Sequence, residues 1–497
     1  MEESWVNSAE RIGADLHLEL FEPGGRRASL IRALREAVRS GRLAPGTRLP
    51  PYRSLAADLG VARNTVADAY AELVAEGWLT ARQGSGTRVA DRAEPLRHAA
   101  RTPIKAPLRA RGPLHDLRQG APDASAFPRA AWLVSYRRAL QQAPSEVFGP
   151  GDPAGRRELR EALTEYLARA RGVRTEPERI VICSGFAHAL RLLFGQGGSA
   201  GRNGGGGGHV GGGDDGVLHG PLAVEAYGLG FHRGLLATAG VRTVPLALDA
   251  DGARVGLLER ERGVLLTPAH QFPTGGPLHA SRRAAVIDWA RARGTVVLED
   301  DYDGEFRYDR KPVGAVQGLD PERVIYIGSV SKSLSPALRL GWMVLPEQYV
   351  DDVLAAKGER EAWASVLDQL SLADFILSGA YDRHVRRMRQ RYRRRRDRLV
   401  EALAEHAPHV EVTGVAAGLH AVLRLPPGTE RSTVKAAAWQ GIALDGLAAF
   451  RHPETTMRAV DGLVVGYATP SEHAYGAAVD ALCGVLPPGE QRGPSTV

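Results

Sequence analysis

Two stretches of the sequence decide the fold: Val296–Asp303, VVLEDDYD, and Val324–Gly341, VIYIGSVSKSLSPALRLG. Each begins with a short apolar run rich in β-branched residues and stops at a polar cluster, which is typical of a buried parallel strand. The first run delivers the carboxylate of Asp300, and the second delivers Lys332, with Arg339 seven residues further on. Because ligands of such sheets lie beyond the carboxyl ends of the strands, we expect these groups to form one site.

The residue types in these stretches suit a single cofactor chemistry. An aldehyde cofactor held as an imine needs a lysine amine that can be desolvated, and the nitrogen of its pyridine ring needs an acidic partner. Lys332 and Asp300 supply these two groups. The cofactor's phosphate needs hydroxyl groups and a cation, which come from Ser329, Ser331 and Arg339. The alternative, a surface lysine and an unrelated loop acid, is disfavoured by the joint order and spacing.

The motifs Glu-Asp-Asp-Tyr at 299–302 and Ser-x-Ser-Lys-Ser-Leu-Ser-Pro-Ala-Leu-Arg at 329–339 resemble the pyridoxal-phosphate site of fold-type I aminotransferases. The version is the one carried by MocR-type regulators of the GntR family. The resemblance implies that Lys332 forms the internal aldimine, that Asp300 pairs with the ring nitrogen and that Tyr302 reaches the ring hydroxyl. It also implies that the phosphate is held by Ser329 and Arg339.

A third stretch supplies backbone groups for the same phosphate. Ile180–Cys183 predicts a short strand, and the following Ser184-Gly-Phe-Ala-His opens a helix with a glycine turn. The free N–H groups at the start of a helix can bind phosphate. The resemblance places Gly185, Phe186 and Ala187 in this cradle.

Residues 15–89 predict a small helical domain ending in a wing. Apolar spacing predicts helices at 29–41 and 54–60 and a third helix from Arg63, with Gly60 at the tight corner of a helix-turn-helix. Short strands on either side of the Gln-Gly-Ser-Gly turn then form the wing. This order of elements resembles the winged helix of GntR regulators.

The exposed residues of this small domain suit DNA. Arginine can pair with guanine and asparagine with adenine when they stand at the start of the recognition helix. Basic residues of the wing can approach phosphates. We assign six residues to DNA contact: Arg53, Arg63, Asn64, Thr65, Arg82 and Arg88. The alternative is a three-helix module used for protein contact.

Length and composition limit the class of protein. A chain of 497 residues is too long for one ordinary domain, and 43% hydrophobic with 24% charged residues predicts folded cores. The net charge of +7 is compatible with a polyanionic partner, although an arginine-rich composition alone would produce it. Two cysteines exclude a disulfide framework or a cysteine metal site, and no apolar run is long enough to span a membrane. We expect a cytoplasmic protein.

The rest of the chain predicts one further domain and its connections. Residues 90–115 form a proline-containing linker, and 116–486 form an α/β aminotransferase-like domain with a mostly parallel sheet and a small α+β subdomain. The glycine runs within 195–216 and the tail at 487–497 are expected to be disordered. Residues 382–400 hold ten arginines around an apolar stripe, which predicts a long helix whose basic face is solvated or contacts DNA.

Four positions depart from the aminotransferase pattern. Phe272 replaces the asparagine that binds the ring hydroxyl, a change that MocR-type regulators share, and Leu229 stands where an aromatic residue stacks on the ring, with Tyr227 or Phe231 as possible substitutes. Pro150 replaces a tyrosine that can reach the partner subunit's cofactor phosphate. Val464 replaces the arginine that clamps the substrate carboxylate. Without that bidentate cation, efficient transamination is not expected.

The sequence therefore predicts a homodimeric transcriptional regulator. Its winged helix would bind operator DNA, and its second domain would hold pyridoxal phosphate at Lys332 and respond to the cofactor or to an amine or amino-acid effector through a shift of population transmitted by the linker. One alternative is an active aminotransferase with a tethered DNA-binding domain. Another is a DNA-binding protein whose aminotransferase-like part binds no cofactor and serves dimerisation.

Overall fold

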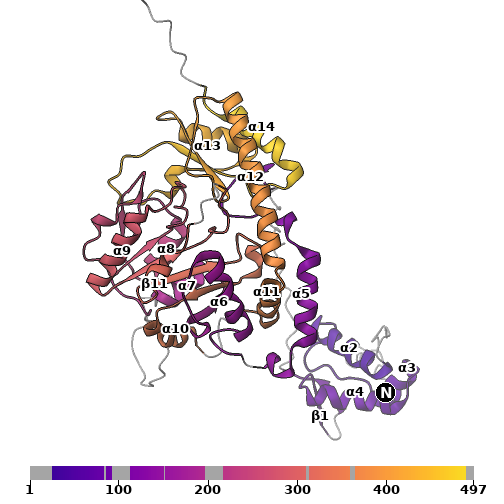
Figure 1. Ribbon diagram of the computed structural model, residues 1–497. Coiled ribbons are helices and arrows are strands. Elements are labelled where there is room, and N and C mark those ends of the chain that lie inside the picture. Colours follow the sequence, from indigo (N-terminus) through magenta and orange to yellow (C-terminus); the bar gives the residue numbers. More distant parts are fainter. Residues whose placement is uncertain are drawn as a thin grey trace, which may run out of the picture. The chain divides into compact units, whose positions relative to one another are not determined.

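The computed structural model describes residues 25–82, 86–91, 112–149, 151–195, 216–308, 313–358 and 364–488. The chain divides into two compact units, Met1–Ala110 and Arg111–Val497 (Figure 1). Most of the predicted linker, glycine-rich insertion and tail lies outside the described residues. No helix in the described part of the chain is both long enough and apolar enough to cross a membrane.

The N-terminal unit is the predicted winged helix-turn-helix. It consists of α2 (Arg26–Arg39), α3 (Tyr52–Asp58) and α4 (Arg63–Ala75), followed by the antiparallel pair β1 (Leu79–Arg82) and β2 (Gly86–Val89). The helix α2 begins earlier than expected, directly after a glycine with a positive φ. The three helices bury one core whose central members are Leu30, Leu34, Val66, Tyr70 and Leu73.

A seven-stranded sheet is the centre of the second unit, in the order β4-β12-β11-β10-β9-β5-β6. Only β12 runs antiparallel to its two neighbours, so the mostly parallel sheet is confirmed. The strands are β4 (Ile180–Cys183), β5 (Leu222–Glu225), β6 (Thr243–Leu246), β9 (Gly263–Leu266), β10 (Val296–Asp300), β11 (Val324–Ser329) and β12 (Gly341–Val344).

Helices cover both faces of this sheet, because alternate residues of its strands are apolar on either side. One face packs against α7 (Phe186–Phe194), α8 (Gly230–Thr238) and α10 (Val350–Lys357). The other face packs against α6 (Arg157–Arg171), α9 (Ala280–Arg293) and α11 (Val366–Leu377). In turn, α11 lies against α5 (Arg129–Gln142). The strands β10 and β11 are parallel neighbours, which brings their carboxyl ends together.

The long helix α12 (Ala380–His406) runs along this unit to the small subdomain (Figure 1). That subdomain has an antiparallel sheet, two helices and its own apolar core. Its main elements are β13 (Glu411–Thr413), β14 (His420–Arg424), β16 (Asp445–Gly446), β17 (Gly462–Gly466), α13 (Glu430–Trp439) and α14 (Tyr475–Val485).

The prediction that the arginines of α12 form a solvated or DNA-facing surface is wrong for Arg395. This side chain is 3% exposed and pairs with Asp123 at 3.0 Å and Glu472 at 2.9 Å. It also donates to three backbone carbonyl oxygens that follow β17. The guanidinium therefore joins α12 to the small subdomain instead of facing water.

A buried ion pair fixes the loop that follows β10. Arg171, the last residue of α6, donates to both carboxylate oxygens of Asp301 at 2.6 and 2.9 Å. The two side chains are 5% and 2% exposed. The Tyr326 hydroxyl on β11 donates to the same carboxylate at 2.7 Å.

We expect Arg171→Ala to lower the free energy of unfolding by about 3–5 kcal/mol, because Asp301 would stay buried without its cation. Urea denaturation of the full-length variant measures this change. Arg157→Ala is the control, since the pair of Arg157 with Glu161 is exposed, and it should leave the denaturation midpoint unchanged. Equal midpoints for the two variants would contradict the expectation.

Candidate functional site

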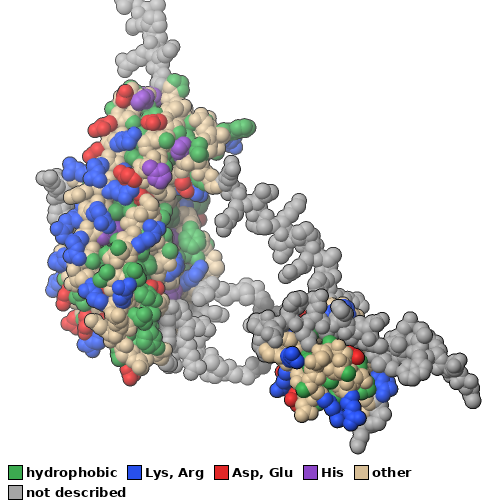
Figure 2. All heavy atoms as spheres, turned by 90° about the vertical axis from the view of Figure 1, so that its right-hand side faces the viewer, with side chains coloured by type: hydrophobic (Ala, Val, Ile, Leu, Met, Phe, Trp, Pro, Cys, Tyr) green, Lys and Arg blue, Asp and Glu red, His purple; other side chains and the backbone are tan. Residues whose placement is uncertain are grey.

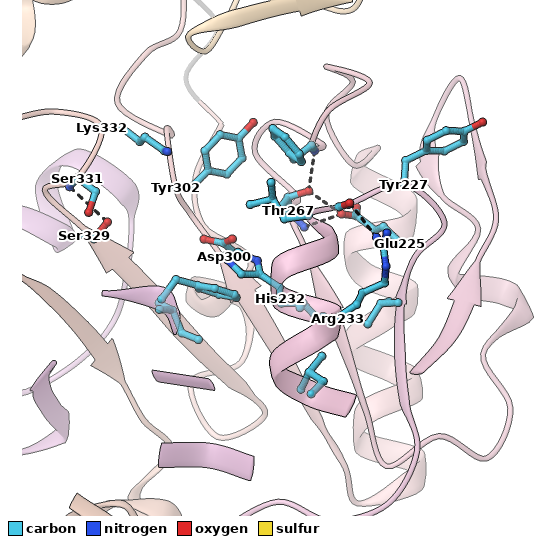
Figure 3. A pocket seen from close by; sticks show the side chains of 18 of the residues that line it. Glu225, Tyr227, His232, Arg233, Thr267, Asp300, Tyr302, Ser329, Ser331 and Lys332 are labelled. Atoms are coloured by element: carbon cyan, nitrogen blue, oxygen red, sulfur yellow. Dashed lines mark hydrogen bonds between the residues drawn. The ribbon is translucent and has the colours of Figure 1, made fainter. Parts of the chain in front are cut away.

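The end of β10 buries four carboxyl groups within five residues: Glu299, Asp300, Asp301 and Asp303 are each less than 9% exposed. Glu299 accepts hydrogen bonds at 2.9 Å from two backbone N–H groups. Asp301 is held by the ion pair described above, and Asp303 by a histidine. Asp300 has no hydrogen-bond partner in the described part of the chain, and it faces a cavity (Figure 3).

That cavity, of about 190 Å³, lies at the carboxyl edge of the large sheet. Figure 3 shows Lys332, Tyr302 and Asp300 directed into it, with Ser329 and Ser331 beside each other on the lysine loop. Six of the predicted cofactor-binding residues are among its lining: Phe186, Asp300, Tyr302, Ser329, Ser331 and Lys332.

The two principal groups of the cavity have perturbed pKa values. Burial lowers the pKa of Lys332, although Asp300 and Asp303 oppose this shift. The Lys332 amine also donates to the carbonyl oxygen of Gly120. Burial raises the pKa of Asp300 well above its usual range, and Lys332 opposes the rise. Burial therefore favours the neutral, nucleophilic form of Lys332. The charge of Lys332 only partly offsets the cost of burying the Asp300 carboxylate.

Three predicted phosphate-binding residues do not line the cavity in the described chain: Gly185, Ala187 and Arg339. Gly185, with a φ of 111°, directly precedes α7, so Ala187 lies in the first helical turn, where N–H groups lack intrahelical acceptors. Arg339 is exposed and has a left-handed backbone with a φ of 53°. Burial, followed by the charges of Lys357, Arg191 and Arg339, lowers the pKa of His188 in α7 to about 4.

Sequence reasoning missed several residues of this cavity. Glu225 accepts hydrogen bonds from the backbone and the hydroxyl of Thr267, at 3.2 and 2.6 Å, and burial raises the pKa of Glu225 to about 7. Both residues stand at the ends of parallel strands, so the rule that found Asp300 could have found them. His232 and Arg233 enter from the first turn of α8 (Figure 3), where no sequence signal distinguished them.

His232 is one of the aromatic residues that line the cavity with Asp300 (Figure 3). Its ring lies 4.6 Å from that of Phe186. Leu229 also lines the cavity, whereas Phe231 is 62% exposed and is not part of the lining. Of the suggested substitutes for a stacking ring, only Tyr227 lines the cavity. Position 150 lies outside the described residues.

Tyr302 is oriented by a buried histidine. Nδ1 of His270 lies 2.8 Å from Oδ2 of Asp303 and 2.9 Å from the Tyr302 hydroxyl oxygen. Because the Asp303 carboxylate can only accept, Nδ1 carries a proton that it shares with both oxygens. Burial, with contributions from the charge and hydrogen bond of Asp303, raises the pKa of Tyr302 well above its usual range. Phe272, at the position of the missing asparagine, lines the cavity without a polar group.

A second buried histidine, His420, makes the stability of the folded protein depend on pH. The His420 ring lies 5.3 Å from His270, and its Nε2 lies 2.9 Å from the carbonyl oxygen of Pro273. Burial, with a contribution from His270, lowers the pKa of His420 to about 3. In the unfolded chain His420 binds a proton below about pH 6.5. The unfolded state therefore binds more protons, and stability is lost as the pH falls from about 6.5 towards 3.

His420→Gln should remove this loss while keeping a donor for Pro273. The difference in free energy of unfolding between wild type and variant should change by up to about 1.4 kcal/mol per pH unit in that range, in favour of the variant at acid pH. Urea denaturation of both proteins at pH 4.5, 5.5 and 7.5 measures it. A difference in free energy of unfolding that does not change with pH would contradict the expectation, because His420 would then bind a proton equally well in the folded and unfolded states.

The predicted DNA-contacting residues lie on the surface of the N-terminal unit. Arg63 and Asn64 are exposed at the start of α4, and Thr65 is half-buried. Arg53, Arg82 and Arg88 are exposed on α3 and the wing strands. The start of the recognition helix is thus open to a ligand.

Two family models match the chain. The model of bacterial regulatory proteins of the gntR family matches residues 27–89, and that of aminotransferase class I and II matches residues 232–459. The uncharacterized HTH-type transcriptional regulator YhdI of Bacillus subtilis is 32% identical over 448 residues, which cover 88% of this chain and 91% of that protein. The chain belongs to the MocR-type branch of the GntR family.

Two further relatives of this GntR-family regulator have more specific descriptions. The probable rhizopine catabolism regulatory protein MocR of Rhizobium meliloti is 32% identical, over 88% of this chain and 89% of that protein. The pyridoxine biosynthesis transcriptional regulator PdxR of Corynebacterium glutamicum is 30% identical, over 82% of this chain and 86% of that protein.

Solved structures resemble the second unit in fold. An archaeal alanine:glyoxylate aminotransferase superposes with a TM-score of 0.65 at 22% identity, over 75% of this chain and 90% of that chain. The α-aminoadipate aminotransferase LysN of Thermus thermophilus superposes with a TM-score of 0.63 at 24% identity, over 76% of this chain and 92% of that chain. The fold-type I aminotransferase fold is thereby confirmed.

Proposed function

We propose that this GntR-family regulator holds pyridoxal 5'-phosphate at Lys332 and changes its DNA binding when the cofactor or an amine effector binds. The observation that carries the proposal is Asp300, a buried carboxylate without a hydrogen-bond partner among the described residues, in the same cavity as a lysine of lowered pKa. A protonated pyridine nitrogen is the partner that such a carboxylate lacks.

Each residue has a defined task in this proposal. Lys332 would supply the amine, whose pKa is lowered by burial, Asp300 would hold the ring nitrogen in its protonated form, and Tyr302, oriented by His270, would reach the ring hydroxyl. The phosphate is assigned to hydroxyl groups of the lysine loop, to the start of α7 and to a cation: Ser329, Ser331, Gly185, Phe186, Ala187 and Arg339. When bound, the cofactor supplies an aldehyde that can join a primary amine covalently.

The surroundings of Val464 favour sensing over turnover. Val464 is fully buried on β17 and packs in one apolar cluster with Phe272 and Phe450. An amino-acid substrate would therefore find no carboxylate clamp on this strand, which weakens the case for an active aminotransferase. The name of PdxR, a regulator of pyridoxine biosynthesis, supports the cofactor itself as one candidate signal.

The winged helix completes the proposed switch. A homodimer would place one recognition helix on each operator half-site, and the bound cofactor or amine would stabilise one arrangement of the units. Arg63 and Asn64 stand where base contact is expected.

Replacing Lys332 by alanine should abolish covalent capture of pyridoxal phosphate. The measurement is the visible absorbance of full-length protein with the cofactor, followed by borohydride reduction and peptide mapping. Lys435→Ala, which removes an exposed lysine on α13, is the matched control and should behave as wild type. Unchanged capture by Lys332→Ala would contradict the assignment.

Arg63→Ala should weaken operator binding by about 1–3 kcal/mol if the guanidinium contacts a base. Binding to operator and to unrelated DNA is compared by fluorescence anisotropy at fixed salt. The control is Arg27→Ala, since Arg27 pairs with Glu72 at 2.6 Å, and it should lose little affinity. Equal affinity of wild type and Arg63→Ala for the operator would place Arg63 outside the interface.

A further inference from the structure

A second cavity, of about 400 Å³, lies between the C-terminal end of α6, the loop after β10 and the first half of α12. Its lining contains two acids, Glu305 and Asp382, and five arginines: Arg169, Arg171, Arg307, Arg386 and Arg389. This excess of positive charge belongs to a recess, whereas Figure 2 shows further Lys and Arg side chains gathered along one side of the second unit.

Two of these arginines have guanidinium groups that no carboxylate neutralises among the described residues. Arg171 is committed to Asp301, and Arg169 pairs with Asp382 at 2.8 Å. In contrast, no carboxylate of the described chain lies within 4 Å of Arg386 or Arg389. Arg389 donates only its Nε, to the backbone carbonyl oxygen of Glu305 at 2.9 Å.

Arg386 and Arg389 are three residues apart on α12, so their side chains share one face of the helix. Like charges in that arrangement repel each other, and a bound anion would convert the repulsion into two charge-assisted contacts. Both arginines belong to the lining of the same cavity. The arrangement therefore selects an anion that can accept from two guanidinium groups.

The floor of the cavity is polar and connected to the lysine loop. The Glu305 carboxyl lies 3.4 Å from the Tyr166 hydroxyl and 3.3 Å from the Tyr381 hydroxyl. Burial, followed by the charge of Asp301, raises the pKa of Glu305 to about 7, so this carboxyl opposes a bound anion less than an ordinary one. The Tyr381 hydroxyl donates to Oγ of Ser333 at 2.7 Å, and Ser333 directly follows Lys332.

We propose that this cavity is a second effector site, which binds a small oxyanion, a phosphate ester or a carboxylate, through Arg386 and Arg389. Its volume exceeds that of a single phosphate ion, so an organic portion of the ligand fits beside the charged group. A recess of this kind suits a small molecule, whereas duplex DNA binds along continuous basic surfaces.

A ligand at this site would act on the cofactor cavity through α12. His384 on the same helix donates Nε2–H to the carbonyl oxygen of Ser333 at 2.8 Å, beside the Tyr381 contact to the same residue. Displacement of α12 would therefore move the residue next to Lys332. This consequence rests on the proposed function, whereas binding of the oxyanion does not.

Isothermal titration of full-length protein with pyrophosphate and with citrate tests the site. Arg386→Gln and Arg389→Gln should each weaken binding about tenfold or more, the loss expected for a charge-assisted contact. Arg393→Gln is the matched control on the same helix, with a side chain 52% exposed, and it should keep wild-type affinity. Because Arg386 is exposed, its variant should fold even where that of Arg389 does not.

Binding of pyrophosphate alone would identify a phosphate ester as the ligand class, and binding of citrate alone a carboxylate. Equal affinities in wild type and Arg386→Gln, or no binding of either probe, would overturn the proposal. Lost operator affinity in Arg386→Gln without any binding of the probes would assign these arginines to DNA and would also overturn it. Lys332→Ala should still bind the probe, so failure of this site and failure of the cofactor assignment are distinguishable.

Discussion

The burial of four carboxyl groups at the end of β10 is the constraint on which the rest of the second unit depends. A buried charge without a partner costs several kcal/mol, so the fold has to deliver partners from remote segments. Arg171 comes from the end of α6, His270 from the loop after β9, and backbone N–H groups from the connection between β10 and β11. These contacts fix the edge of the sheet at which Asp300 and Lys332 share a cavity.

The burial of these carboxyl groups also gives the cavity the properties of a binding site. Asp300 is the acid that this network leaves without a hydrogen-bond partner among the described residues, and it faces the cavity instead of a fixed cation. Tyr302 is held by His270, whose proton is anchored on Asp303. One polar network thus both stabilises the loop and orients a donor, which is how a rigid scaffold prepares a site.

Sequence identity shows the family of this chain, whereas similarity of fold does not show its activity. Identity to regulators of the MocR type over most of the sequence establishes the family. The solved aminotransferases share the fold at less than 25% identity, and fold alone does not determine activity. Val464 and Phe272 belong to one buried apolar cluster of this chain.

The sequence by itself determined the two folds and the central residues of the cavity at the sheet edge, because strand ends, helix periods and the Lys332 loop are local patterns. Position 395 lies three residues after Tyr392 and four before Leu399, on the buried stripe of α12, but the sequence could not show that Asp123 and Glu472 meet Arg395 there. Nor could it pair Arg171 with Asp301, 130 residues away, or group Arg386 and Arg389 with Glu305. Those contacts depend on which segments become neighbours after folding, and only the tertiary structure decides that.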